Sequence, residues 1–151
     1  MSSVGASPRW LWPACVVPTV AGFAISGYLT WAHFREGAVL ACPETGVINC
    51  QKVTSSPQSY LFGVPVAVLG LLFFAAMLVL TFPPAWRSPN PLVHRARLLT
   101  VSAGVLFVIY LVYAEVFVLD AICLWCTAVH ALTVVLFAVI SVGTAVLPDQ
   151  G

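Results

Sequence analysis

Four long apolar stretches, almost free of charged residues, dominate this sequence. They cover residues 10–34, 61–82, 98–119 and 123–146, and Glu115 is the one Asp, Glu, Lys or Arg within them. A helix needs about 20 predominantly apolar residues to cross the hydrocarbon core of a bilayer. We therefore predict an all-α membrane protein, a four-transmembrane-helix bundle formed by these four stretches.

Composition excludes other classes of protein. Charged residues make up only 7% of the chain, whereas soluble domains carry about 25%. The net charge of +1 and the absence of a basic patch argue against a nucleic-acid partner. A length of 151 residues predicts a single domain over 1–151. A cleaved signal peptide is the alternative for residues 10–34, but that stretch is too long for one and has aromatic residues at both ends.

Four of the five cysteines fall into two closely spaced pairs. Cys42 and Cys50 lie in the polar segment 35–60, and Cys123 and Cys126 lie at the start of the fourth stretch. Segment 35–60 and the turn 120–122 are the first and third connections of a four-span protein. Odd-numbered connections lie on the same side of the membrane, so both pairs should share one face.

The distribution of basic residues predicts which face this is. The other face would hold four arginines, against Arg35 and Lys52 on the cysteine face; the four are Arg9, Arg87, Arg95 and Arg97. By the positive-inside rule, both termini are then cytoplasmic and the loop between helices 1 and 2 is exoplasmic. Disulfides persist in such a compartment.

The Cys123-Leu-Trp-Cys126 motif has the chemistry of a redox centre. Side chains at positions i and i+3 share one helix face, and the positive end of the helix dipole favours the thiolate. A zinc half-site completed by Cys42, Cys50 and His33 or His130, and an inert disulfide, are the alternatives. We favour a catalytic pair and predict no metal.

Cys42 and Cys50 suit a second step of thiol exchange. Their loop should be exposed to water, so a soluble thiol protein could reach it, and exchange proceeds through mixed disulfides. A structural clip for a flexible loop is the alternative. Cys15, alone within the first stretch, is expected to be an inert apolar residue.

Three segments together resemble the vitamin K epoxide reductase family. They are Cys42 followed by Cys50-Gln-Lys-Val-Thr-Ser-Ser56, then Tyr60-Leu-Phe-Gly63-Val-Pro65, and finally Cys123-Leu-Trp-Cys126-Thr-Ala-Val-His130. The chain is most similar to the bacterial members, which couple disulfide formation to quinone reduction. The resemblance extends from the first apolar stretch to the fourth.

The resemblance implies a role for each matched residue. Cys126 matches the quinone-adjacent cysteine and Cys123 its partner in the active-site disulfide. Cys50 matches the shuttle cysteine that attacks Cys123, Cys42 exchanges with a thioredoxin-fold protein, and Ser56 lies near the quinone head group. The implied enzyme is a membrane thiol oxidoreductase of the plasma or inner membrane. It reoxidises a secreted DsbA-like protein and passes the electrons to menaquinone or ubiquinone, supporting disulfide bond formation.

Two departures from the family pattern refine this expectation. Vertebrate members carry a tyrosine four residues after the last cysteine, where this chain has His130, which argues against vitamin K epoxide as the substrate. Some bacterial members carry a fused thioredoxin-like domain, and this sequence ends at Gly151, so we expect a separate partner. Epoxide reduction, and a non-enzymatic membrane protein with structural disulfides, remain the alternatives.

Further residues are candidates for the quinone pocket. Ionisable residues within a span are functional candidates, which applies to Glu115 and His130, although an interfacial carboxylate and a buried structural histidine are the alternatives. Phe62 and Trp125 suit an apolar quinone pocket or plain packing. Asp120 is expected to make a turn and to cap the last helix.

Overall fold

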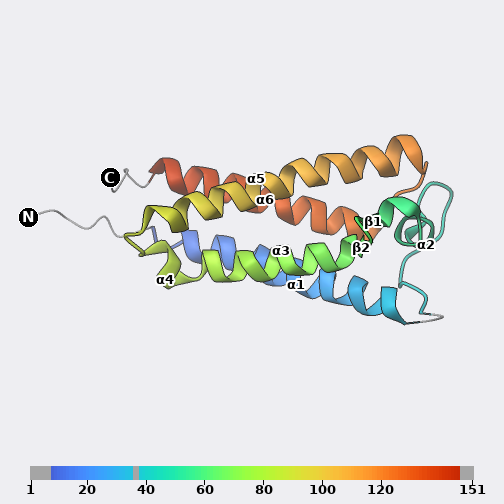
Figure 1. Cartoon of the computed structure of the whole chain (residues 1–151), viewed down its shortest axis with the longest axis horizontal. Coiled ribbons are helices and arrows are strands. Elements are labelled where there is room, and N and C mark those ends of the chain that lie inside the picture. The colour runs from blue at the N-terminus through green and yellow to red at the C-terminus, as the bar shows by residue number, and fades with distance from the viewer. Residues whose placement is uncertain (1–7, 36–37, 147–151) are drawn as a thin grey trace, which may run out of the picture.

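The chain folds into a bundle of long helices, seen in a computed structural model that describes residues 8–35 and 38–146 (Figure 1). The long elements are α1 (Leu11–Phe34), α3 (Val66–Thr81), α5 (Pro91–Tyr113) with its π-helical continuation η2 (Ala114–Val118), and α6 (Leu124–Val146). The short elements are α2 (Cys50–Thr54), η1 (Pro57–Ser59), the antiparallel pair β1 (Tyr60–Leu61) and β2 (Val64–Pro65), and α4 (Pro83–Trp86).

The four long helices pack side by side. Helix α1 contacts α3 and α6, and α5 contacts the same two helices. Figure 1 shows α1 ending, and α6 beginning, at the end of the bundle that carries α2 and the β1–β2 hairpin. We call this the cysteine end. Helix α4, the start of α1 and the end of α6 lie at the opposite end.

Three helices in the described residues are long and apolar enough to cross a membrane: α1, α5 with η2, and α6. The structure therefore confirms a mostly helical chain with three helices that could span a membrane. Helix α3 is apolar but has only 16 residues, so the fourth span stays a prediction.

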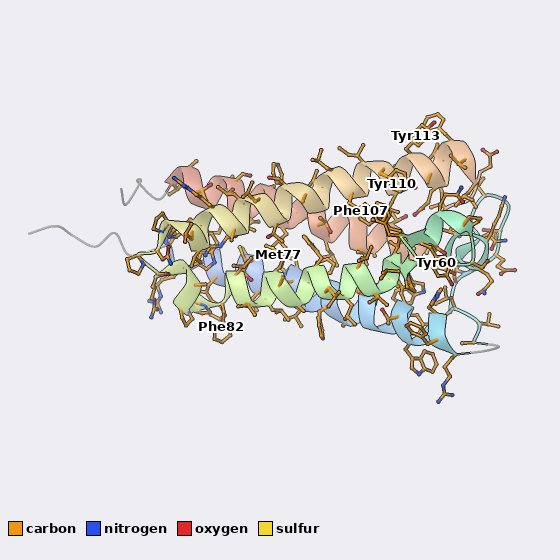
Figure 2. The ribbon with its side chains drawn as sticks, in the orientation of Figure 1. Tyr60, Met77, Phe82, Phe107, Tyr110 and Tyr113 are labelled. Atoms are coloured by element: carbon orange, nitrogen blue, oxygen red, sulfur yellow. A yellow bond between two sulfur atoms is a disulfide. The ribbon has the colours of Figure 1, made fainter. Side chains whose placement is uncertain are left out.

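The outer surface of the bundle is apolar, as a lipid-facing surface should be. Tyr113 projects from α5 away from the other helices and Phe82 is exposed beyond α3, whereas Met77 points between the helices and is fully buried (Figure 2). Hydrophobic side chains thus occupy both the core and the outside of the bundle.

The structure corrects the predicted helix over 61–82, which begins only at Val66. Phe62 and Gly63 have φ angles of 52° and 80°, in the left-handed region that turns use and helices do not. They form the turn of the hairpin in which Tyr60 pairs with Pro65. An uninterrupted apolar run does not distinguish this hairpin from a helix.

The predicted helix over 98–119 also begins elsewhere, at Pro91. Asn90 caps it, because its side-chain oxygen accepts a hydrogen bond from the Leu92 N–H at 2.9 Å. Pro91 suits the first helical position, because a backbone N–H there would have no partner within the helix and proline lacks one. Arg95 and Arg97, which we placed on the face opposite the cysteines, therefore belong to the first turns of α5.

Close packing of α1 against α3 depends on a glycine. A Cβ added at Gly22 would lie closer than 3.0 Å to the ring of the buried Phe74, whereas one added at Gly27 would meet Leu71 Cδ1 at 3.8 Å, an ordinary contact. We expect Gly22→Ala to lower the free energy of unfolding by about 1–3 kcal/mol, the usual range for an overpacked core. Gly27→Ala is the matched control and should be neutral or slightly stabilising. Unfolding in mixed micelles measures both, and equal effects would contradict this account of the packing.

Candidate active site

A short backbone pairing joins the loop between α1 and α2 to the segment before α6. Ile48 and Ile122 form a parallel bridge, in which the Asn49 N–H donates to Ile122 O at 3.0 Å and the Ile122 N–H donates to Val47 O at 2.8 Å. Because the two segments run in the same direction at this bridge, the residues that follow them lie side by side. Those residues include Cys50 and Cys123.

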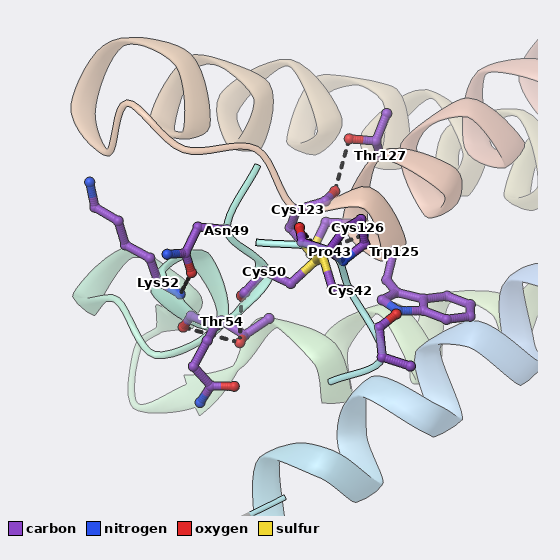
Figure 3. Close-up of a disulfide and its surroundings, with 12 residues drawn as sticks. Cys42, Pro43, Asn49, Cys50, Lys52, Thr54, Cys123, Trp125, Cys126 and Thr127 are labelled. Atoms are coloured by element: carbon purple, nitrogen blue, oxygen red, sulfur yellow. Dashed lines mark hydrogen bonds between the residues drawn. A yellow bond between two sulfur atoms is a disulfide. The ribbon is translucent and has the colours of Figure 1, made fainter. Parts of the chain in front are cut away.

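All four paired cysteines meet at this point. Cys50 and Cys123 are buried in one apolar cluster, and the half-buried Cys42 and Cys126 pack against it. Cys42 and Cys50 form a disulfide with a Cα–Cα distance of 6.2 Å, and Cys123 and Cys126 are free thiols (Figure 3). The structure therefore confirms that the two pairs share one end of the bundle.

Cys123 caps the N-terminus of α6. The Cys126 N–H donates to Cys123 Sγ at 3.2 Å, the bond that a capping side chain makes with the third helical residue. The predicted cap, Asp120, instead has a φ of 46° in the preceding turn, three residues before Cys123. A hydrogen bond from the Cys126 thiol lowers the pKa of Cys123, and this effect outweighs burial, which acts in the opposite direction. Cys123 is thus the thiol best stabilised as a thiolate.

Glu115 lies directly behind this thiol. Its carboxylate accepts a hydrogen bond from the Cys123 N–H at 3.2 Å, and its side chain is only 6% exposed. The π-helical turn η2 carries the residue, a departure from α-helix that often marks functional sites. Glu115 is therefore buried within the bundle and is not a solvated carboxylate at the membrane interface.

The hydrogen bond that Glu115 accepts leads to a stability prediction. Glu115→Ala leaves the buried Cys123 N–H without an acceptor, which costs about 1–3 kcal/mol in free energy of unfolding. Glu115→Gln retains an acceptor oxygen and should lose much less. Unfolding of both variants in mixed micelles tests the bond, and an equal loss in both would contradict it.

A cavity of 1140 Å³ opens between the helices beside the cysteines. Its walls are mostly apolar, with Leu29, Phe73 and Phe107 among them, and its polar lining includes Ser56, Glu115, Cys126 and His130. Among the described residues, Cys126 is the one cysteine that lines this cavity. It thus belongs both to the cysteine cluster and to the cavity wall.

The structure brings together most of the residues proposed for the pocket, with two exceptions. Phe62 is 97% exposed at the hairpin turn, and Trp125 lines a separate, smaller hollow of 370 Å³ with Ala24, Ile25, Tyr28 and Ala41. The positive φ of Phe62 turns its side chain outward, and Trp125 lies on the side of α6 that faces the loop. Neither residue lines the cavity of 1140 Å³.

Sequence reasoning missed two features of the cavity. Gln58 lines it with a buried side-chain oxygen that has no partner, and Tyr60 Oη lies 3.0 Å from His33 Nε2 at its rim. Only the polarity of residues 51–60 within an otherwise apolar chain could have indicated them. Among the described residues, no group of three or more His, Cys, Asp or Glu could hold a metal ion.

The sequence profile of the vitamin K epoxide reductase family matches residues 13–141. This chain belongs to that family. The resemblance inferred from the motifs is thereby confirmed, and the matched range contains all four clustered cysteines. Vitamin K epoxide reductase family members are membrane thiol-disulfide oxidoreductases that use quinones as electron partners.

The cavity fits a ligand of that class. Small-molecule sites are concave, mostly apolar and supplied with a few convergent polar groups. Here the polar groups are the Cys126 thiol, the Glu115 carboxylate and the His130 imidazole, the last buried on α6 one turn after Cys126. In a vitamin K epoxide reductase family protein, these residues and Ser56 are the ones that would hold a quinone.

Proposed function

We propose that this protein reoxidises a separate DsbA-like thioredoxin-fold protein and passes the electrons through its two cysteine pairs to a quinone, which is menaquinone or ubiquinone. The observation that carries the proposal is the position of Cys126, which contacts the cysteine cluster on one side and lines the cavity on the other. No other clustered cysteine in the described residues lines the cavity, so electrons that reach the quinone leave through Cys126.

The relay has two balanced thiol-exchange steps. Two thiols of the partner reduce the Cys42–Cys50 disulfide, and the partner gains a disulfide. Cys50 then attacks a Cys123–Cys126 disulfide at Cys123, Cys126 leaves as a thiol, and Cys42 displaces Cys123 to restore the Cys42–Cys50 disulfide. The oxidised loop pair and free helix pair seen here correspond to the stage after electrons have moved inward.

Two properties of Cys123 favour this order of events. Its lowered pKa makes it a good leaving group when Cys42 attacks Cys50, because a thiol of lower pKa leaves faster. Its position after the Ile48–Ile122 bridge puts it beside Cys50, so exchange needs little movement of the backbone. Proximity of this kind makes the reaction effectively unimolecular.

The quinone, when bound, accepts two electrons and two protons from the Cys123 and Cys126 thiols. The cavity residues have separate parts in this step. The Glu115 carboxylate, hydrogen-bonded beside Cys123, can take a thiol proton, and the His130 ring can donate a hydrogen bond into the cavity. Ser56, whose hydroxyl donates to Val53 O at 2.7 Å, fixes the cavity wall after α2.

The membrane arrangement follows from the same proposal. The protein lies in the plasma or inner membrane with the cysteine end exoplasmic and both termini cytoplasmic. Arg97 is buried. The exposed basic residues that favour this orientation are therefore Arg9, Arg87 and Arg95. Helix α3, about 24 Å long at 1.5 Å per residue, becomes the fourth span together with the β1–β2 hairpin and α4 at its ends.

Accessibility of the loop favours a protein partner for Cys42. The residues that follow it, from Pro43 to Val47, are all exposed, whereas Cys50 and Cys123 are buried. A folded thiol protein can therefore reach Cys42 and no deeper sulfur. Cys42 is the entry point for electrons in this proposal.

Purified protein in lipid discs, supplied with a reduced DsbA-like protein and either menaquinone, ubiquinone or vitamin K epoxide, tests the function. We expect one quinone to be reduced for each partner dithiol oxidised, with little reduction of the epoxide. Partner oxidation that does not depend on quinone would overturn the proposal. Preferential use of the epoxide would establish the alternative substrate.

A further inference from the structure

Two aromatic side chains hold the backbone just before Cys42. Trp125 Nε1–H donates to the Ala41 carbonyl oxygen at 3.0 Å, and the Ala41 N–H donates to Tyr28 Oη at 3.1 Å. The two rings contact each other edge to face, with centroids 5.1 Å apart. Both backbone polar groups of one residue are thus bound by side chains from two different long helices, α1 and α6.

The position of these contacts gives them a chemical meaning. Trp125 is the second of the two residues between Cys123 and Cys126, and Ala41 directly precedes Cys42. The contacts therefore tie the entry cysteine of the loop to the helical redox pair. The Ile48–Ile122 bridge fixes the other end of the loop, before Cys50.

Opening of the disulfide removes the covalent link between Cys42 and Cys50. Of the residues between them, those from Pro43 to Val47 are exposed, so the reduced loop would let Cys42 move away from Cys50 if nothing else restrained it. The bonds to Ala41 restrain the Cys42 side independently of the disulfide, and they add to the burial of Leu40 and to the Thr45–Ile48 bridge within the loop.

We propose that Tyr28 and Trp125 form an aromatic clamp on Ala41 that keeps Cys42 beside Cys50 while their disulfide opens and closes. Both are positioning residues, because their side chains hydrogen-bond to the loop backbone at Ala41 and act on Cys42 through it. This inference rests on the proposed function. In that relay, the clamp speeds the attack of Cys42 on the Cys50–Cys123 mixed disulfide.

Equilibrium with glutathione tests the clamp without any quinone. Two glutathione thiols reduce the Cys42–Cys50 disulfide to two thiols and become one glutathione disulfide. The equilibrium constant gives the effective concentration of Cys42 at Cys50. The experiment uses the full chain with Cys123→Ser and Cys126→Ser, which remove the second pair. Trp125→Phe and Tyr28→Phe are then each added to this double variant and compared with it. A net hydrogen bond corresponds to a factor of about five, so each variant should lower the effective concentration about fivefold.

Trp31→Phe is the matched control. Trp31 stacks on Tyr28 with a centroid distance of 6.1 Å but makes no bond to Ala41, so the equilibrium constant should not change. Unchanged constants in both clamp variants would overturn the proposal. If Trp125→Phe fails to fold, Tyr28→Phe decides alone.

Acid quenching during turnover supplies a second readout. In chains with all cysteines intact, the clamp variants should accumulate the Cys50–Cys123 mixed disulfide several-fold over the wild type, because Cys42 returns more slowly. The glutathione result stands even if wild-type protein reduces no quinone, so failure of the clamp and failure of the proposed function are distinguishable.

Discussion

Cys126→Ala protein is expected to reduce quinone at least about a thousandfold more slowly than the wild type, the scale of loss when an essential reacting group is removed. The reason is geometric, because Cys126 is the clustered cysteine that lines the cavity. Cys42 and Cys50 remain, so the variant should still oxidise one equivalent of partner dithiol before it stops. Single-turnover mixing, with partner oxidation and quinone absorbance followed together, measures both effects.

Cys15→Ala is the control for this experiment. Cys15 is fully buried and packs with Leu11 and Met77 in a separate cluster, so removing it should leave quinone reduction intact. Full turnover by Cys126→Ala would remove this residue from the electron path and with it the relay.

The same substitution should change the pH dependence of Cys123. A hydrogen bond from Cys126 lowers the pKa of Cys123 in the native chain, so Cys126→Ala should raise it, and the Cys123 thiolate should then form only at higher pH. Cys126→Ser retains a hydroxyl donor and should shift the titration less. Ultraviolet thiolate absorbance in a Cys15→Ala background, against a Cys123→Ser reference, reports the titration. A titration that does not move would contradict the hydrogen bond.

Arg97→Ala is expected to lower the free energy of unfolding by roughly 3–5 kcal/mol, since two charge-assisted hydrogen bonds, each contributing about 1.5–3 kcal/mol, are lost. The Arg97 side chain is 0% exposed. It donates from Nε to Leu80 O at 2.8 Å and from Nη2 to Ala85 O at 3.0 Å. Its guanidinium also lies 3.7 Å from the centroid of the Trp86 ring.

These contacts explain why the effect should be large. Leu80 O belongs to the last turn of α3, where backbone carbonyls have no partner within the helix, and Ala85 O belongs to α4. Arg97 thus ties α3, α4 and α5 together at the end opposite the cysteines. Lysine lacks the planar fork needed to reach two carbonyls and stack on an indole ring, so Arg97→Lys should also be destabilising.

Arg95→Ala provides the comparison. Arg95 is an exposed arginine two residues away on the same helix, and its removal should change the free energy of unfolding by less than about 0.5 kcal/mol. Unfolding of the three variants in mixed micelles, with the wild type alongside, measures the difference. Similar stability of Arg97→Ala and Arg95→Ala would show that the buried contacts contribute little.

The apolar stretches determined much of the fold. Stretches 10–34 and 123–146 lie within one residue of α1 and α6, because an uncharged run of that length is stable as a helix in lipid. Alternation of the connections then brought Cys42 and Cys50 to the same end as Cys123 and Cys126, without knowledge of any contact. Helix beginnings were less predictable, since hydropathy does not register the positive φ at Phe62 or the Asn90 cap.

Only the tertiary structure decided how the site is built. The bridge between Ile48 and Ile122 consists of backbone hydrogen bonds. Almost any pair of residues could make such bonds, so no side-chain pattern predicts the bridge. The burial of Glu115 behind Cys123 and the lining of the cavity by Cys126 depend on how α5 and α6 pack. The same packing turns Trp125 toward the loop, although it lies next to Cys126 in the sequence. Hydropathy is a local property of the chain, whereas these contacts join residues that are distant in sequence, or divide neighbours between two faces of one helix.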